Sequence, residues 1–232
     1  MDKCVTIITG ASKGIGESIV KNLLSKSMNR VVLAARNSEQ MKDIVSNCDP
    51  DSYLIAPTDV SKESDVKRLM ELTYDKFNQI NCLINNAGYV DPLGILETSL
   101  EEWNKTIATN LTGTFLTTRE VIKFMKKTGG KIINVASTAG LTPRPGWCAY
   151  AASKAAVINL SMSQADELSS YGIKVFCIAP GRTATDLRKR LAPNEDPTSI
   201  MQPDAVFEVV KFLMSPNADT LEGQVLQVRE RH

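Results

Sequence analysis

The chain alternates between short apolar runs and longer segments of helical character, and this alternation limits how it can fold more than any other feature does. The apolar runs read CVTIIT, RVVLAA, SYLIAP, NCLIN, KIINVA, KVFCIAP and VLQV. The segments between them span residues 15–27, 39–47, 62–77, 101–127, 149–171 and 203–214. Such alternation is typical of right-handed βαβ units, in which helices cover both faces of apolar parallel strands. The sequence therefore predicts an α/β fold with a doubly wound, mostly parallel sheet of seven strands, one for each run.

Length and charge exclude several classes of protein. A chain of 232 residues is long enough for one sizeable core, so we expect a single domain over residues 1–232. The 27 Lys and Arg nearly balance the 26 Asp and Glu, and no basic stripe stands out, so we expect no nucleic-acid partner. No run approaches the roughly 20 apolar residues that cross a bilayer, so we expect no membrane segment. A cytoplasmic location is the default expectation.

Cysteine and histidine limit the chemistry further. The five cysteines are scattered without C-x-x-C spacing, so they do not form a disulfide framework, and most are expected to pack in the core. The only histidine is His232, the last residue. This excludes Ser-His-Asp and Cys-His catalysis and a histidine-ligated zinc site, and we expect no metal. Proton transfer must depend on other groups.

A glycine-rich turn, TGASKGIG, follows the first apolar run and leads into a helix-like segment, with glycines at positions 10, 14 and 16. Glycine lets the backbone approach a ligand closely, and the N-terminus of the helix offers unpaired N–H groups to a pyrophosphate. The turn therefore predicts a dinucleotide-binding site. The alternative is a turn that needs its glycines for structural reasons alone.

Tyr150 and Lys154, in the run YAASK, are four residues apart and would share one face of a helix. An isolated tyrosine titrates near pH ~10, but a nearby cation favours the phenolate and lowers that pKa. The spacing therefore predicts a phenol that can act as an acid at neutral pH. The alternative is an exposed polar face of a long helix.

Taken together, TGASKGIG, the NNAG motif at residues 85–88, Asn110, Ser137, YAASK and Pro180-Gly181 resemble the short-chain dehydrogenase/reductase family over almost the whole chain. The resemblance is specific in order and spacing, since Ser137 precedes Tyr150 by thirteen residues. It implies a Rossmann-like fold, a nicotinamide cofactor and hydride transfer to or from a carbonyl carbon.

The family's catalytic residues correspond to four positions of this chain. By resemblance, Tyr150 would be the general acid in reduction, and Lys154 would lower its pKa and hold the ribose hydroxyls of the nicotinamide. Ser137 would donate a hydrogen bond to the substrate oxygen, and Asn110 would help to hold a water relay beside Lys154. The alternative roles are structural: a turn for the serine and a local bend for the asparagine.

The family's other motifs imply contacts with the cofactor. The NNAG motif would pass close to the adenosine ribose, with Asp59 facing the adenine amine and Val60 against its ring. The segment after the sixth run would hold the carboxamide, although the family usually has an aliphatic residue where Thr183 stands. The predicted cofactor site consists of Gly10, Ser12, Lys13, Gly14, Ile15, Gly16, Arg36, Asp59, Val60, Asn86, Ala87, Gly88, Tyr150, Lys154, Pro180, Gly181, Thr183 and Thr185.

The end of the second apolar run favours NADP over NAD. An acidic residue there would bind the ribose 2′-hydroxyl and repel a 2′-phosphate, whereas RVVLAARN places Ala35 and then Arg36 at this point. Lys13 in the glycine turn is expected on the same side, with no acid opposing the two cations. The alternative is that both are solvated surface charges.

Residues 181–202 form the one stretch that looks loosely structured, and they follow the end of a strand. Ligands bind at this edge of parallel sheets, so we expect a loop that covers the substrate; the alternative is an ordinary connection. Apolar candidates for the substrate pocket are Leu187, Leu191, Ile200, Leu141, Pro143, Trp147 and Val90. An apolar pocket with an aromatic wall favours a ketone or dicarbonyl substrate.

Two further stretches, GWCAYAASKAA and LEGQVLQVRERH, are similar to the benzil reductase-like and sepiapterin reductase-like carbonyl reductases. The end of the chain lacks the D-G-G turn common in ketoacyl-carrier-protein reductases. We therefore expect an NADPH-dependent carbonyl reductase first and a 3-ketoacyl thioester reductase second. A non-catalytic NADP(H)-binding sensor of the same fold is the third alternative, which the intact catalytic set disfavours.

The resemblance also implies a homodimer or homotetramer, because family members usually pair through the helices that flank Asn110 and Tyr150. Small residues in the segment 149–171, such as Ala151, Ala152 and Ala155, would let two helices approach closely. The alternative is that these residues pack within one subunit.

Overall fold

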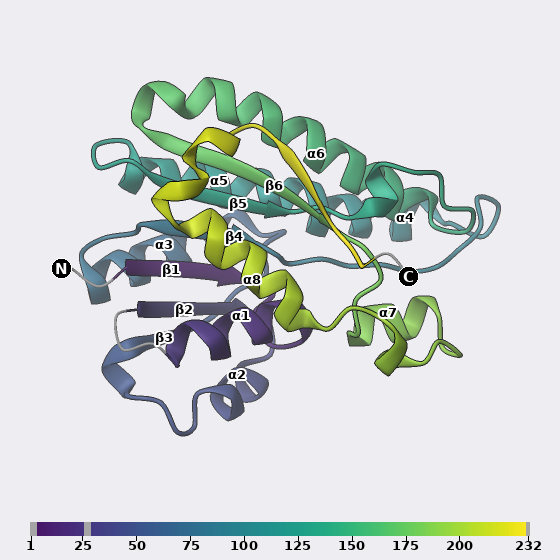
Figure 1. Ribbon diagram of the computed structural model, residues 1–232, viewed down its shortest axis with the longest axis horizontal. Helices are drawn as coiled ribbons and strands as arrows, with labels where there is room; N and C mark the ends of the chain where they lie inside the picture. Colours follow the sequence, from purple (N-terminus) through teal and green to yellow (C-terminus); the bar gives the residue numbers. More distant parts are fainter. Residues whose placement is uncertain (1–3, 26–28, 231–232) are drawn as a thin grey trace.

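The computed structural model describes residues 4–25 and 29–230 and shows one parallel sheet of seven strands (Figure 1). The strands are β1 (Cys4–Thr9), β2 (Asn29–Ala35), β3 (Tyr53–Pro57), β4 (Cys82–Asn85), β5 (Gly130–Val135), β6 (Ile173–Pro180) and β7 (Val225–Val228). Their order across the sheet is β3-β2-β1-β4-β5-β6-β7. The predicted doubly wound α/β fold is confirmed. His232 and the end of the predicted helix at 26–27 lie outside the described residues.

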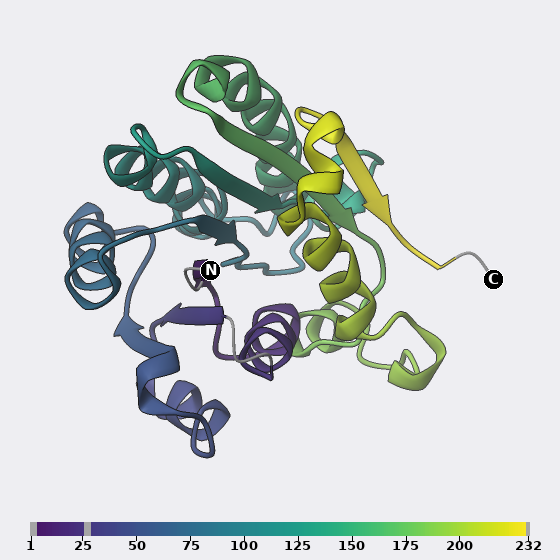
Figure 2. The same cartoon turned by 60° about the vertical axis from the view of Figure 1, so that its left-hand side comes forward.

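Helices cover both faces of the sheet (Figure 2). The main helices are α1 (Gly14–Leu24), α2 (Ser38–Ile44), α3 (Glu63–Phe77), α4 (Leu100–Ile107), α5 (Gly113–Met125), α6 (Cys148–Leu168), α7 (Asp186–Leu191) and α8 (Pro203–Met214). On one face, Ile19 of α1 and Val206 of α8 belong to one buried apolar cluster. On the other face, Val66 of α3 and Val121 of α5 belong to a second cluster. The strands between them are apolar because both of their faces are covered.

Two parts of the chain differ from what the sequence predicts. The segment 101–127, expected to be one continuous helix, contains a π-helical turn at Ala108–Thr112 between α4 and α5. Residues 181–202, expected to be loosely structured, contain the helix α7. Thr185 caps α7, since its Oγ1 accepts a hydrogen bond from Arg188 N at 3.1 Å. The segment therefore has its own local structure.

A buried polar network ties the centre of the sheet to the helices behind it. Asn85 Nδ2 donates to Asn134 Oδ1 at 2.9 Å, which links the ends of β4 and β5. Thr117 of α5 donates to Asn85 Oδ1 at 2.7 Å, and Asn134 Nδ2 donates to Ser161 and Gln164 of α6. Satisfied networks of this kind stiffen a core. The network therefore fixes α6 against the sheet.

Candidate active site

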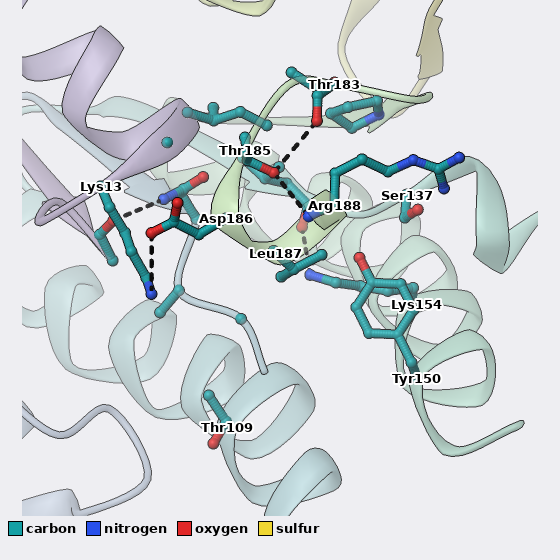
Figure 3. Close-up of a pocket in the computed structure, with 18 of the residues that line it drawn as sticks. Lys13, Thr109, Ser137, Tyr150, Lys154, Thr183, Thr185, Asp186, Leu187 and Arg188 are labelled. Atoms are coloured by element: carbon teal, nitrogen blue, oxygen red, sulfur yellow. Dashed lines mark hydrogen bonds and ion pairs between the residues drawn. The ribbon is translucent and has the colours of Figure 1, made fainter. Parts of the chain in front are cut away.

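A cavity of about 770 Å³ opens at the carboxyl ends of the strands. It is lined by the turn after β1, the ends of β2, β4, β5 and β6, the start of α6, and α7. The strand order reverses between β1 and β4, and open α/β sheets bind ligands beside such a reversal. Figure 3 shows side chains from α6 and from residues 183–188 gathered around this space.

The glycines of the turn after β1 let it pack closely on the loop after β4 and on Thr185. Gly10 and Gly14 have φ angles of 65° and 57°, a conformation that side chains rarely allow. A Cβ added at Gly10 would lie 2.8 Å from Ala87 Cα. Lys13, at the N-cap of α1, makes no capping hydrogen bond with its side chain, which leaves this helix end open to an anion. The turn therefore fits a dinucleotide pyrophosphate.

Asn86 holds the loop after β4 against this turn. Its Nδ2 donates to the carbonyl oxygens of Thr9 at 3.0 Å and Gly10 at 3.2 Å. Thr9 Oγ1 in turn accepts hydrogen bonds from the backbone N–H groups of Asn86 and Ala87, both at 3.0 Å. The two strand ends on this side of the cavity are therefore joined by reciprocal hydrogen bonds.

Tyr150, Lys154 and Ser137 lie together on the cavity wall (Figure 3). Tyr150 and Lys154 come from successive turns of α6 and are only 7% and 4% exposed. Ser137 follows β5, where its Oγ accepts a hydrogen bond from Ala139 N at 3.1 Å. Three of the four predicted catalytic residues therefore share one surface.

Burial dominates the titration of the two α6 residues. It raises the pKa of Tyr150, an effect that interaction with the Ser137 hydroxyl offsets only in part, and it lowers the pKa of Lys154 to about 8. Lys154 Nζ lies 5.9 Å from the centre of the Tyr150 ring and donates to Val135 O at 2.8 Å. The expected lowering of the Tyr150 pKa by Lys154 is not found, because both side chains are out of water and the ammonium is directed to a backbone carbonyl.

Asn110 lies behind the wall rather than on it. Its Nδ2 donates to Tyr89 O and to Ser153 Oγ, both at 2.9 Å, and its Oδ1 accepts from Tyr89 N at 2.7 Å. A Cβ added at Gly88 would lie 3.8 Å from both Asn110 Oδ1 and Lys154 Nζ, so Asn110 is near Lys154 as expected. Its neighbour Thr109 lines the cavity instead. The side chain of Asn110 holds the π-helical turn against α6 and the loop after β4.

All but one of the predicted cofactor residues line the cavity. They are Gly10, Ser12, Lys13, Gly14, Ile15, Arg36, Asp59, Val60, Asn86, Ala87, Gly88, Tyr150, Lys154, Pro180, Gly181, Thr183 and Thr185. The exception, Gly16, is buried in α1, where a side chain would collide with the Gly10 carbonyl oxygen. Its role in the structure is close packing of the helix on the turn.

The two cations predicted to select NADP both lie at the cavity edge, but an acid lies near each of them: Asp59 interacts electrostatically with Arg36, and Asp186 pairs with Lys13. Arg36 is exposed at the end of β2, whereas Lys13 Nζ lies 3.7 Å from Asp186 Oδ2 of α7. Both side chains of this pair are about half exposed or more, and such a pair is worth only about 0–1 kcal/mol. A phosphate could therefore displace Asp186 from Lys13. The contact of Asp186 with Lys13 was not predicted, because residues 181–202 were expected to be a loop.

The apolar cover of the cavity is smaller than the sequence suggests. Trp147, Leu187 and Leu191 pack around Tyr150 and the buried Val90, and the Trp147 and Tyr150 ring centres lie 6.4 Å apart. Leu141 and Pro143 do not line the cavity, and Ile200 faces a neighbouring one between α1 and residues 184–204. Lining residues that the sequence does not predict include Thr109, Arg144, Pro145, Asp186 and Arg188. Threonine followed by aspartate is a common start of a helix and could have located α7.

Two features are absent from residues 4–25 and 29–230. Within these ranges, no helix has the length and apolar character needed to span a bilayer. The same ranges contain no group of three or more His, Cys, Asp or Glu side chains placed to hold a metal ion.

Comparison with known proteins gives a consistent picture. The family model for short chain dehydrogenases matches residues 4–196. A 3-oxoacyl-[acyl-carrier-protein] reductase of Synechocystis sp. is 36% identical, with 97% of this chain and 94% of the relative covered. These findings do not single out the benzil or sepiapterin reductase-like branches that the sequence suggested; the relative just described is a 3-oxoacyl reductase.

Solved structures agree over nearly the whole length of the chain. A 3-ketoacyl-(acyl-carrier-protein) reductase from Brucella melitensis, complexed with NADH, has a TM-score of 0.90 at 30% identity and covers 98% of this chain and 97% of its own. ElxO with NADP bound has a TM-score of 0.88 at 29% identity, covering 97% of each chain. Levodione reductase has a TM-score of 0.89 at 28% identity, covering 99% and 97%. The chain belongs to the short-chain dehydrogenase/reductase family and is an oxidoreductase of that family.

Proposed function

We propose that this protein is an NADPH-dependent reductase that converts a ketone or dicarbonyl to an alcohol, with Tyr150 as the general acid. The observation that carries the proposal is that Tyr150, Ser137 and Lys154 line the same cavity as the glycine turn. A buried phenol with a raised pKa is neutral at pH 7, so it has a proton to donate. The cavity itself fits a dinucleotide at its glycine end.

When bound, the nicotinamide cofactor would supply a hydride to the carbonyl carbon. The Ser137 hydroxyl would donate a hydrogen bond to the carbonyl oxygen, where negative charge develops. Tyr150 Oη would transfer its proton to that oxygen, which completes the alcohol and leaves a phenolate. The Lys154 ammonium on the same helix would then stabilise the phenolate by its charge until a proton is regained.

Two substrate classes have specific support. The apolar cover of Trp147, Leu187 and Leu191 and the similarity to levodione reductase favour a ketone or diketone. The 36% identity to a 3-oxoacyl-[acyl-carrier-protein] reductase favours a 3-oxoacyl thioester, which also carries a ketone beside a second carbonyl. The remaining alternative is an NADP(H)-binding sensor without turnover.

Turnover with a substrate panel decides among these alternatives. The loss of NADPH absorbance would be followed with diketones, 3-oxoacyl thioesters and sugars. We expect oxidation of NADPH with at least one ketone of the first two classes. Tight NADPH binding without oxidation on any member of the panel would contradict the proposal and favour the sensor.

Arg36→Asp is expected to shift cofactor preference from NADPH toward NADH by about 10- to 100-fold in kcat/KM. A charge-assisted hydrogen bond to the 2′-phosphate is worth about 1.5–3 kcal/mol, and an aspartate there would repel the phosphate and bind the free hydroxyl. Lys42→Asp is the matched control, because Lys42 lies exposed on α2 and pairs with Glu39. An unchanged NADPH/NADH ratio in steady-state kinetics would refute the assignment.

We further propose a homodimer or homotetramer in the cytoplasm. Along α6, Ala152 and Ala155 are exposed, whereas Val157 is buried within the subunit. Met162 of α6 and Phe115 of α5 are also exposed, by 39% and 44%. This supports pairing through these helices, and the molar mass in solution tests it: a monomer at micromolar concentration would contradict the proposal.

A further inference from the structure

The cavity is much more basic than the chain as a whole. The full sequence has a net charge of +1, but the cavity lining contains six cationic side chains and only two acidic ones. The cations are Lys13, Arg36, Arg144, Lys154, Arg182 and Arg188, and the acids are Asp59 and Asp186. A cleft lined by one sign of charge concentrates ligands of the opposite sign. The cavity is therefore built for more than one anionic group.

Only some of the cationic side chains lie where a dinucleotide would bind. Lys13 and Arg36 are at the glycine turn and at the end of β2, whereas two arginines lie beside Trp147. Arg188 Cζ is 6.0 Å from the centre of a Trp147 ring, and the backbone of Arg144 adjoins Trp147, whose N–H donates to the Arg144 carbonyl at 3.1 Å. Trp147 also packs edge-on against Tyr150, the proposed acid. These two arginines therefore belong to the end of the cavity that receives the substrate.

Arg188 is held in one orientation by a neighbouring acid. Its Nε and Nη2 donate to the two carboxylate oxygens of Glu195 at 2.5 and 2.7 Å, and both side chains are less than a fifth exposed. No described residue accepts a hydrogen bond from its Nη1. Glu195 also accepts from Arg182 Nη1 at 3.2 Å, so two guanidinium groups share one carboxylate. The cluster therefore stays cationic and presents a pre-oriented donor.

Arg144 has no counter-ion among the described residues. It lies exposed on the loop between β5 and α6, and no acid of the described chain lies within ion-pair distance. A purely apolar substrate would gain nothing from two cations at this position. An anion on the substrate would gain two charge-assisted contacts, with the planar guanidinium groups suited to bidentate binding.

We propose that the substrate carries an anionic group, a carboxylate or a phosphate, beyond its reacting carbonyl, and that Arg188 and Arg144 bind this group. The proposal rests on the reductase function above and narrows it, since neutral diketones would be poorer substrates. Arg188 and Arg144 are then specificity-determining residues for the reaction.

Matched pairs of substrates test the proposal and separate the two sources of charge. One pair is a 3-oxo carboxylate and its methyl ester; the other is a 3-oxoacyl thioester of phosphopantetheine and that of pantetheine. We expect the charged member of at least one pair to have a kcat/KM about tenfold higher or more at low ionic strength, with the preference falling as salt is added. The pair that shows the preference identifies the carboxylate or the phosphate as the ligand.

Variants of the two arginines test whether these residues cause the preference for the charged substrate. Arg144→Gln and Arg188→Gln should each lower the preference about tenfold, chiefly through KM. In the Arg188→Gln variant, Glu195 keeps Arg182 as its partner. Lys189→Gln is the control, since Lys189 lies on α7 outside this cavity. Equal kcat/KM for both members of each pair, with no effect of Arg144→Gln, would overturn this inference alone. No turnover of any ketone would overturn the reductase function itself.

Discussion

Replacing Tyr150 with phenylalanine is expected to lower turnover about a thousandfold while NADPH binding and the fold are retained. The substitution removes only the hydroxyl, and general acid catalysis by a positioned side chain typically contributes about 10²–10⁴-fold. The ring would still pack against Trp147, Val90 and Ala139, so the cavity keeps its shape. Single-turnover oxidation of NADPH measures the chemical step, and quenching of tryptophan fluorescence measures cofactor binding.

Tyr171→Phe supplies the matched control for this variant. Tyr171 is 47% exposed in the short 3-10 turn that follows α6, the helix that carries Tyr150, so loss of its hydroxyl should leave turnover as in the parent protein. If Tyr150→Phe also reduces ketones at the parental rate, the proton comes from another group and the mechanism is wrong.

Replacing Lys154 with methionine is expected to lower turnover by about a hundredfold or more and yet to stabilise the folded chain at pH 7. Burial lowers the pKa of Lys154 from 10.5 to about 8, so the unfolded chain binds this proton more tightly than the folded one. The shift corresponds to about 3 kcal/mol of lost stability at neutral pH. Methionine has a similar length and no charge, although the hydrogen bond to Val135 O is lost.

The sign of the pH dependence follows from the same shift. Below pH 8, Lys154 is charged in both the folded and the unfolded chain, so the full loss of stability from burying the charge applies. Between about pH 8 and 10.5, the folded chain has released the proton and the unfolded chain still holds it. The free energy of unfolding of the parent protein should therefore rise across this range, and the advantage of Lys154→Met should shrink. Urea unfolding of both proteins at several pH values measures this difference in the free energy of unfolding. Lys126→Met, at an exposed site, is the control, and an advantage for Lys154→Met that is constant with pH would contradict the interpretation.

The strands and most helices could be predicted because their signals are local. The run VLQV is β7 and the segment 203–214 is α8, with the same bounds in the structure. The helix α7 is harder to predict in this way, because its only local signal is the capping pair Thr185-Asp186 and its sequence DLRKRL is mostly charged. An ion pair between Arg188 of α7 and Glu195, seven residues further along the chain, supports the helix. Pattern reasoning has no access to such contacts.

The residues of the candidate site could be predicted from the sequence, but the burial that sets their pKa values could not. Order and spacing placed Tyr150, Lys154 and Ser137 on one wall, because i, i+4 neighbours on a helix and the end of an adjacent strand have fixed positions in this fold. The direction of the Tyr150 pKa depends on how much water the surrounding elements exclude. That quantity arises from packing of the whole domain and is not encoded in any one segment.

The pairing of Asn85 with Asn134 has a consequence for how this protein can vary in sequence. Each side-chain amide donates and accepts hydrogen bonds in the interior of the sheet. Replacing one of the two with an aliphatic residue would leave polar atoms of the other buried without a hydrogen-bond partner. Change at either position therefore requires a coordinated second substitution. We expect descendants of this chain to keep the two asparagines or to lose both together.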